Sequence, residues 1–554
     1  MNGSGGHGGS QIDSSSVSDG GTPSLAITSP GSPAYTNKSV EVTISVTGDT
    51  AASRSVQLLE NGTLLSTISG PPYDFKWDTA AVDEGSYQLV AQMDVAGQII
   101  ASVPVTIIVD RTPPTIVSRS PDSGATNVSL TNPIQVVFSE ALAPANVTAS
   151  AVTLALGSTA VGATAALGTD GKTVSVSIAN LASLALPGTM TENATSAITD
   201  LAGNAFAGAS WNFAVPLWVD LGTVSGGMPQ MVLDSSGVPI VATIATSGST
   251  SQLLIGKHVS GTTWDTTSIP SPQIQTTVTE FSLAIDKSNA LFLAWDEVYA
   301  SGVATPILVA RWGGTTWDRR YGQLLQMAGG AAERPAIAVT GDGSPVVRWA
   351  ELVFIASGPD YVARWNGTAW TPLAGGLSGD CDILPCRIVL DSSDDPVIET
   401  NGQISRWTGS SWTAPVGGGD GMAVNSSQLV VTTQNGGTTI QVVGISSTGT
   451  EANYVPALGT SPVQTEGLSY GQIAVDGSDE PVIVWFQFDG GTTANPTNPN
   501  LHVARWTGAA WDQGYGMLDN ASGFSALVLA QDTTPIVAWG DASQTTVHIS
   551  KSNH

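Results

Sequence analysis

A repeat of roughly 50 residues in the C-terminal part constrains the fold of this 554-residue chain more than any other feature. Its most regular part is an apolar stretch ending in Arg-Trp, a Gly turn, and a second stretch that opens on Trp. Clear copies occupy residues 309–317, 362–370 and 503–511, and looser ones lie at 255–264 and 404–412. Further apolar hairpins occupy residues 231–241, 283–293, 388–398 and 473–483. The alternation and turn residues predict four β-strands per unit.

The number and closure of these units follow from their spacing. They begin near residues 228, 281, 335, 386, 422, 471 and 525, which is the spacing of β-propeller blades. The seventh unit supplies three strands, and residues 217–222 match its missing fourth. The fourth strands would carry Trp218, Trp264, Trp317, Trp370, Trp412, Tyr454 and Trp511. Because a ring leaves no sheet edge exposed, we expect residues 216–554 to form a seven-bladed β-propeller with terminal-strand closure.

The region before the repeat has a different pattern of short strands. Residues 25–109 alternate apolar and polar positions in short stretches, separated by turns such as Glu60-Asn61-Gly62, which is typical of a β-sandwich. This turn, followed by residues 72–79 and 85–89, resembles bacterial Ig-like domains found on adhesins and surface enzymes. The resemblance implies an Ig-like domain at residues 24–110, in which Tyr87 is a tyrosine-corner residue.

A second sandwich is expected after a proline-rich linker. Residues 110–114 read Asp-Arg-Thr-Pro-Pro, and successive prolines favour extended backbone. Residues 120–128, 137–140 and 198–204 resemble the Ig-like repeats of bacterial surface-layer and secreted proteins. This resemblance implies a second Ig-like domain at residues 111–215 that serves as a spacer or stalk. Glu140 and Asp200 are then expected to be turn and edge residues.

Residues 1–23 are rich in Gly and Ser and predict a flexible tether. The segment resembles the region that follows the lipidated cysteine of bacterial lipoproteins, with Met1 where that cysteine would stand. A plain linker or a cloning residue is the alternative. No apolar run reaches the ~20 residues of a membrane helix. We therefore expect an extracellular or cell-surface location on a bacterium, without a membrane span and with a lipid anchor only through the missing cysteine.

The charge balance excludes one class of partner. The chain has 18 Lys and Arg against 45 Asp and Glu, a formal charge of -27, which would repel the phosphates of nucleic acid and anionic lipid. The two cysteines, Cys381 and Cys386, are close enough to form a disulfide, with free thiols as the alternative. No cofactor is expected. Calcium binding stays an open alternative, although no ligand motif supports it, and the binding of any other metal is unknown.

Candidate binding residues follow the second strands, next to long irregular loops that would share one face of a propeller. These loops are expected at residues 296–306, 350–360 and 489–500. Carboxylates at that rim could bind a cation or an amine, and aromatic rings could stack on a sugar. The carboxylates are Asp296, Glu297, Glu351, Glu399, Asp489 and Asp541, and the aromatic residues are Trp295, Trp349, Trp485 and Trp539. The alternatives are solvated loop carboxylates and Trp packing between neighbouring blades.

Catalytic motifs are scarce in this sequence. The Gly-x-x-Trp turns resemble the end of the Asp-box of sialidase-type propellers, but Trp312, Trp365 and Trp506 stand where that motif has Asp. Arg334 and Arg348 could belong to a sialidase arginine triad, yet no spacing singles them out. Only three histidines lie outside the termini, so a His-based triad or zinc site has little material. No catalytic residue is predicted.

Three hypotheses of function remain. We expect a noncatalytic extracellular binding or adhesion protein, in which an Ig-like stalk presents a propeller to a glycan or protein partner. The first alternative is a propeller glycoside hydrolase or lyase that acts on extracellular polysaccharide through the rim carboxylates, Glu351 and Glu399 among them. The second alternative is a structural component of the cell envelope.

Overall fold

The computed structural model describes residues 22–553 apart from 49–53, 249, 273, 275–276, 298–305, 325–330, 353–358, 374–376, 378–385, 401, 420, 436–438, 460–468 and 493–494, and residue 520. The described chain is all-β, with three short 3-10 helices. None of these helices has the length and apolarity needed to cross a membrane. The predicted tether lies almost entirely outside the described residues.

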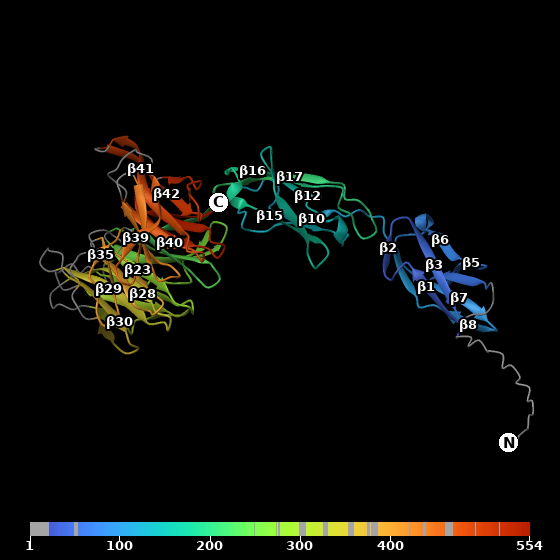
Figure 1. Ribbon diagram of the computed structural model, residues 1–554, viewed down its shortest axis with the longest axis horizontal. Coiled ribbons are helices and arrows are strands. Elements are labelled where there is room, and N and C mark those ends of the chain that lie inside the picture. Colours follow the sequence, from blue (N-terminus) through green and yellow to red (C-terminus); the bar gives the residue numbers. More distant parts are fainter. Residues whose placement is uncertain are drawn as a thin grey trace, which may run out of the picture. The chain divides into compact units, whose positions relative to one another are not determined.

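The chain divides into two compact units, coloured along the sequence in Figure 1. Unit 1 comprises Met1–Ala125, Asn132–Asn180 and Thr189–Phe213. Unit 2 comprises Thr126–Thr131, Leu181–Gly188 and Ala214–His554. Two short segments of the second predicted sandwich, Thr126–Thr131 and Leu181–Gly188, therefore group with the repeat region.

The first sandwich has two sheets. One contains β1 (Ser24–Ser29), β3 (Ser39–Thr47) and β6 (Tyr73–Asp78). The other has the order β2 (Ala34–Thr36), β9 (Val105–Val109), β7 (Gly85–Val95), β4 (Val56–Glu60) and β5 (Thr63–Ile68), with β8 (Gln98–Ala101) paired to β7. Alternate residues of these strands, Val42, Leu58 and Trp77 among them, form the core. The hydroxyl of Tyr87 donates a 2.8 Å hydrogen bond to the Asp83 carbonyl, as a tyrosine corner requires.

The second sandwich has two four-stranded sheets. One sheet has the order β10 (Ile116–Ser120), β11 (Ile134–Phe138), β15 (Thr173–Ile178) and β14 (Ala163–Leu167). The other has the order β13 (Thr159–Val161), β12 (Val152–Leu156), β16 (Gly188–Ala194) and β17 (Ala209–Val215). Phe138 and Phe206 pack edge to face in the core, with ring centroids 5.3 Å apart. Both sandwiches thus bury the inward-facing residues of alternating strands.

Unit 2 contains seven sheets among its described residues, each built on four antiparallel strands. The strands follow the sequence order in six of these sheets, and the seventh takes its outer strand from the start of the unit. The first three are β19 (Gly227–Leu233), β20 (Pro239–Ser247), β21 (Thr250–Ser260), β22 (Thr263–Asp265); β23 (Phe281–Ile285), β24 (Leu291–Asp296), β25 (Ile307–Trp312), β26 (Trp317–Asp318); and β28 (Ala331–Val339), β29 (Pro345–Leu352), β30 (Asp360–Trp365), β31 (Trp370–Pro372). A short β27 (Gln323–Leu324) also pairs with β25.

The remaining four sheets repeat this plan. They are β32 (Ile388–Leu390), β33 (Pro396–Thr400), β34 (Gln403–Arg406), β35 (Val416–Gly417); β36 (Met422–Val424), β37 (Val430–Asn435), β38 (Thr439–Ile445), β39 (Glu451–Gly459); β40 (Ser469–Val475), β41 (Pro481–Thr492), β42 (Asn495–Trp506), β43 (Trp511–Asp512); and β45 (Ala521–Leu529), β46 (Pro535–Asp541), β47 (Thr546–Ser552), β18 (Trp218–Ser225). A short β44 (Met517–Asp519) pairs with β42.

The first strands of the seven sheets contact one another in a cycle. β19 contacts β23, and the contacts continue through β28, β32, β36, β40 and β45 back to β19. Second strands such as β24 are buried along their whole length, because they lie between the outer strands of their own sheet and the neighbouring sheets. Each sheet itself is open.

The seventh sheet joins the two ends of the unit. Its outer strand β18 precedes the first sheet in sequence and pairs with β47, the last strand of the chain, from Trp218↔Ser552 to Ser225↔Thr546. A register shift lies between Asp220 and Gly222 in β18. This is the pairing that residues 217–222 predicted.

Two local expectations were wrong. Trp412 was expected in a fourth strand, but it forms an isolated bridge with Trp407, and the outer strand is β35 instead. Residues 489–500 were expected to be a long irregular loop, but β41 and β42 extend through them as a hairpin that reaches Thr492↔Asn495. The paired ladder satisfies backbone groups that a loop would leave to water.

Candidate functional site

The predicted rim tryptophans are buried and bonded to neighbouring acceptors. At the end of β24, Trp295 Nε1 donates to Glu297 Oε1 at 3.0 Å, and in β29 Trp349 Nε1 donates to Glu351 Oε1 at 2.9 Å. In β41 the acceptor is Gln487 Oε1, 3.1 Å from Trp485 Nε1. All these side chains are buried. The repeated motif is therefore Trp-x-Glu or Trp-x-Gln, in which the indole donates a hydrogen bond to the side chain two positions later.

The faces of three of these indole rings are covered by the third strand. Trp349 stacks on Tyr361 with ring centroids 5.6 Å apart, Trp485 on His502 at 5.3 Å, and Trp539 on His548 at 5.4 Å. Each partner is the residue directly opposite in the sheet. The expectation of sugar-stacking rings at an open rim is corrected by this packing, because covered ring faces cannot stack on a ligand.

Four of the six predicted carboxylates are also buried, namely Asp296, Glu297, Glu351 and Glu399. Asp296 is buried and accepts hydrogen bonds from the backbone N–H groups of Thr279 and Glu280, at 3.1 and 2.7 Å. Burial nevertheless raises the pKa of its carboxyl group. Glu399 is buried and accepts from the Gly402 N–H at 2.9 Å. Together with Glu297 and Glu351, these residues correct the expectation of a solvent-facing acidic ring, since each carboxylate serves internal donors.

The remaining two predicted carboxylates are Asp541 and Asp489. Asp541 is half-buried and accepts from the Thr545 N–H at 3.0 Å and the Ser543 hydroxyl at 2.7 Å, so it caps the turn between β46 and β47. Asp489 belongs to strand β41, and its side chain lies outside the described residues.

The Arg of each Arg-Trp pair binds the Asp that closes the first turn of its sheet or a neighbouring turn. Arg311 pairs with Asp286 at 3.3 Å and Arg406 with Asp391 at 3.1 Å, and Arg505 pairs with Asp476. These aspartates also accept backbone hydrogen bonds from the residues two and four positions later. The repeated Asp and Arg are therefore turn-stabilising residues.

A cavity lies where the first strands of the seven sheets converge. It consists of two adjoining hollows, the larger with a volume of about 200 Å³, which share Pro229, Gln230, Cys386 and Ser525 as lining residues. Residues from all seven first strands or the positions beside them line it. Cys386 is disulfide-bonded, and the only other cysteine in the sequence, Cys381, lies outside the described residues.

Charged residues of both signs stand at this cavity. Glu280 and Arg334 both line it, and the Arg334 N–H binds the Glu280 carboxylate. Burial and then the nearby charge of Asp296 raise the pKa of Glu280 to about 7, while Arg334 opposes this rise. From the sequence, Arg334 was considered only as a member of a sialidase arginine triad, and Glu280 was not predicted at all. Neither residue belongs to a repeated motif.

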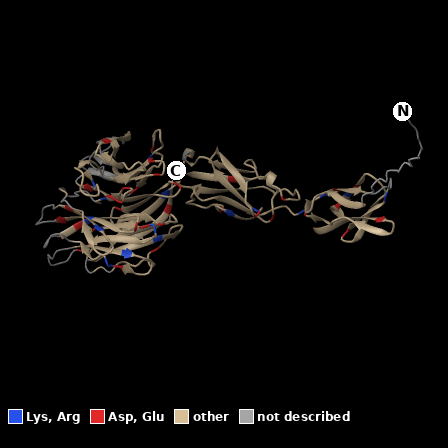
Figure 2. Ribbon diagram, turned by 60° about the horizontal axis from the view of Figure 1, so that its bottom comes forward, with Lys and Arg blue, Asp and Glu red and all other residues tan. Residues whose placement is uncertain are grey.

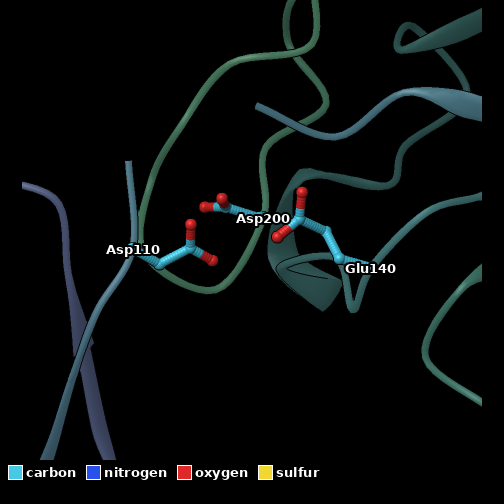
Figure 3. Close-up of side chains that lie close together, drawn as sticks. All are labelled: Asp110, Glu140 and Asp200. Carbon is cyan, nitrogen blue, oxygen red and sulfur yellow. The ribbon is translucent and has the colours of Figure 1, made fainter. Parts of the chain in front are cut away.

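Unit 1 contains a separate acidic cluster. Asp110, Glu140 and Asp200 point toward one another in Figure 3, with carboxylate oxygens that all lie within 4.8 Å of one another. Asp200 is buried and accepts two hydrogen bonds from Asn204, at 2.8 and 2.7 Å. Burial, a hydrogen bond to Asp110 and the charges of Asp110 and Asp200 raise the pKa of Glu140 to about 7.

These three residues are the described group that could hold a metal, since carboxylate oxygens are the ligands that calcium prefers. The sequence reading missed the cluster. Asp110 was expected in a linker and the other two residues at turn and edge positions, and no motif spacing connects the three. Acidic residues outside this cluster are spread over the strands and turns of both units (Figure 2).

Comparison with known proteins identifies the two sandwiches. Residues 110–215 match the family model described as a bacterial Ig-like domain, and residues 23–91 match that of a bacterial Ig domain. The chain therefore contains two bacterial Ig-like domains, in keeping with the resemblances above. No curated protein matches the chain.

Solved structures give only distant likenesses. A protein of unknown function from Dyadobacter fermentans is 10% identical over 61% of this chain and 100% of its own, with a TM-score of 0.35. A mutant NanB sialidase from Streptococcus pneumoniae is 11% identical over 93% of this chain and 94% of its own, with a TM-score of 0.34. A fucose lectin from Kordia zhangzhouensis is 16% identical over 27% of this chain and 99% of its own, with a TM-score of 0.20. Likenesses at this level carry no argument about function.

Proposed function

We propose that this protein is a noncatalytic extracellular binding protein, in which two Ig-like domains accompany a seven-bladed β-propeller that binds a glycan or protein partner. One observation carries the proposal. The first strands of the seven sheets contact one another in a cycle, and β18 completes the last sheet. A radial arrangement of sheets around a central channel is the architecture of a propeller, and its channel is a common place for a binding site.

The extracellular location rests on the Ig-like domains. Both domains match models of bacterial Ig domains, and the disulfide at Cys386 is typical of proteins that fold outside the cytosol. The composition of the chain also suits display in solvent, because its formal charge of -27 favours solubility.

The burial of the rim carboxylates favours binding over turnover. A glycosidase uses two carboxyl groups that both reach the scissile bond. Glu351 and Glu399 are buried and accept hydrogen bonds from Trp349 and from the Gly402 backbone. Two of the carboxylates on which the hydrolase alternative was based are therefore engaged by internal donors, which supports binding over turnover.

The test is a glycan array and a bacterial-surface binding assay with the full-length chain, together with release of product from chromogenic glycosides. The proposal expects retained partner and no product. Product release that Glu351→Gln or Glu399→Gln abolishes would establish the hydrolase instead. Failure to retain any glycan, surface or protein partner would leave a structural role as the better account.

A further inference from the structure

The cavity where the seven first strands meet has features of a ligand site. Equivalent polar side chains on the first strands bridge adjacent sheets. Gln230 donates to the Phe281 carbonyl at 2.7 Å and accepts from the Leu283 N–H at 2.8 Å. Ser282 accepts from the Ile337 N–H at 3.1 Å, and Gln472 donates to the Ser525 carbonyl at 3.1 Å. The wall of the cavity is therefore rigid and hydrogen-bonded.

Two buried polar atoms depart from this pattern. The Ser525 hydroxyl and Oε2 of Glu280 have no hydrogen-bond partner among the described residues, although both atoms are buried. Ser525 is only 5% exposed, and both residues line the cavity. Buried polar groups are nearly always paired, so these two atoms point to a group that enters the cavity and bonds them.

Backbone strain occurs at the same place. Arg334 has a φ of 57° and lies within the bulge between Glu333 and Ala336 in β28. A left-handed backbone is unfavourable for a side chain of this size, and such strain gathers at binding sites. The bulge sets Arg334 beside Glu280 at the cavity wall.

The chemistry of the lining selects the ligand. The charges that act on Glu280 are those of acidic Asp296 and Glu333 and of cationic Arg334. Acidic groups therefore outnumber the single cation here, so the wall is not a site for a simple anion. Phe281 and Phe524 add apolar rings, with Met228, Pro229 and Pro335 beside them. Hydroxyl donors and acceptors next to rings are what a neutral sugar requires, since its hydroxyl groups bond polar side chains while its C–H face packs on apolar ones.

We propose that this cavity binds one neutral saccharide unit, whose ring enters the larger hollow and bonds Ser525, and whose hydroxymethyl arm enters the smaller hollow, bonds Glu280 and meets Phe524. The inference rests on the proposed function and deepens it by naming the place and class of the ligand. The larger hollow, which Ser525 lines and which has a volume of about 200 Å³, is suited to a single ring rather than a chain. The smaller hollow, which Glu280 and Phe524 line and which has a volume of about 30 Å³, is suited to one hydroxymethyl arm of that ring.

The test is saturation-transfer NMR and calorimetry on the full-length protein. The probes are methyl glycosides of glucose, galactose, mannose, fucose and N-acetylglucosamine, with glucuronic acid as the anionic arm. At least one neutral glycoside is expected to bind. Its affinity should fall at least tenfold in Glu280→Gln and in Ser525→Ala, each with an unchanged melting temperature. Glu451→Gln is the matched control, because Glu451 is exposed on β39 of the same unit, and it should bind as the wild type does.

The outcomes separate this inference from the proposed function. Retention of a glycan or protein partner by the wild type and equally by Glu280→Gln and Ser525→Ala would keep the binding function and overturn the cavity as its site. Binding of glucuronic acid alone would overturn the neutral class. Absence of binding to any probe, with a protein partner still retained, would overturn the inference and leave the function standing. If Glu280→Gln unfolds, the glycoside affinities of Ser525→Ala and Phe524→Leu test the inference in its place. Unchanged affinity in both variants would overturn it.

Discussion

The indole Nε1 of Trp349 donates a 2.9 Å hydrogen bond to Oε1 of Glu351, and both side chains are fully buried. Glu351→Ala would leave this donor without its acceptor, which costs about 1–3 kcal/mol. Glu351→Gln keeps an amide oxygen in place, as Gln487 does for Trp485, so its cost should be about 1 kcal/mol or less. Urea unfolding followed by Trp fluorescence measures both. Equal losses in the two variants would show that the hydrogen bond contributes little.

The buried carboxyl group of Glu192 is expected to make the stability of the second Ig-like domain depend on pH. It is fully buried in β16, and neither carboxylate oxygen has a hydrogen-bond partner among the described residues. Burial raises its pKa from 4.5 to about 7, against the opposing charge of Arg119. The folded state therefore holds the proton more tightly than the unfolded state. This contribution is fully present below pH 4.5 and is lost as pH rises through about 7.

The pKa difference corresponds to about 3 kcal/mol between the two plateaus. Calorimetric unfolding of the full chain should show the transition of this domain falling in temperature between pH 4.5 and 7. Glu192→Gln should remove most of that dependence and leave the transitions of unit 2 unchanged. A pH dependence of the same size in the variant would assign the effect to another group.

Gly222 is irreplaceable by any residue with a side chain. Its φ is +96°, and a Cβ atom there would overlap the carbonyl oxygen of Thr262. Gly222→Ala is therefore expected to destabilise unit 2 by about 1–3 kcal/mol or more. Gly477→Ala is the control, because its φ is unstrained and a Cβ meets nothing within 4 Å, and its effect should stay within about 0.5 kcal/mol. Thermal unfolding compares the two, and equal stabilities would contradict the close approach of β18 to Thr262.

Much of the fold of unit 2 follows from local sequence. Alternating apolar residues and Gly turns placed the first strands near residues 228, 281 and 525, where β19, β23 and β45 lie. The strand at residues 217–222 was recognised because it repeats the fourth-strand pattern. The extension of β41 and β42 was missed, because Asp489 and the glycines after it are typical of loops in a single sequence.

The candidate sites were harder to predict, because they depend on which residues meet across sheets. Trp295 and Trp349 recur at one position, and recurrence alone does not say whether a ring faces solvent or a neighbour. The acidic cluster joins Asp110, Glu140 and Asp200 from three separate segments. Glu280, which precedes β23, and Ser525 in β45 are more than 200 residues apart in the sequence. None of these spatial contacts produces a spacing pattern that can be recognised in the sequence.

The pairing of β18 with β47 completes the seventh sheet of the proposed propeller, and an engineered disulfide tests it most directly. Ser225 and Thr546 are paired residues on the two strands, and paired positions in a sheet are close enough for a disulfide. The double variant Ser225→Cys, Thr546→Cys should oxidise within one molecule and migrate faster on a non-reducing denaturing gel, reversibly with reductant. Ser225→Cys with Thr534→Cys, in the turn between β45 and β46, is the control and should not cross-link. Absence of the cross-link in the first variant would contradict a ring closed by its two ends.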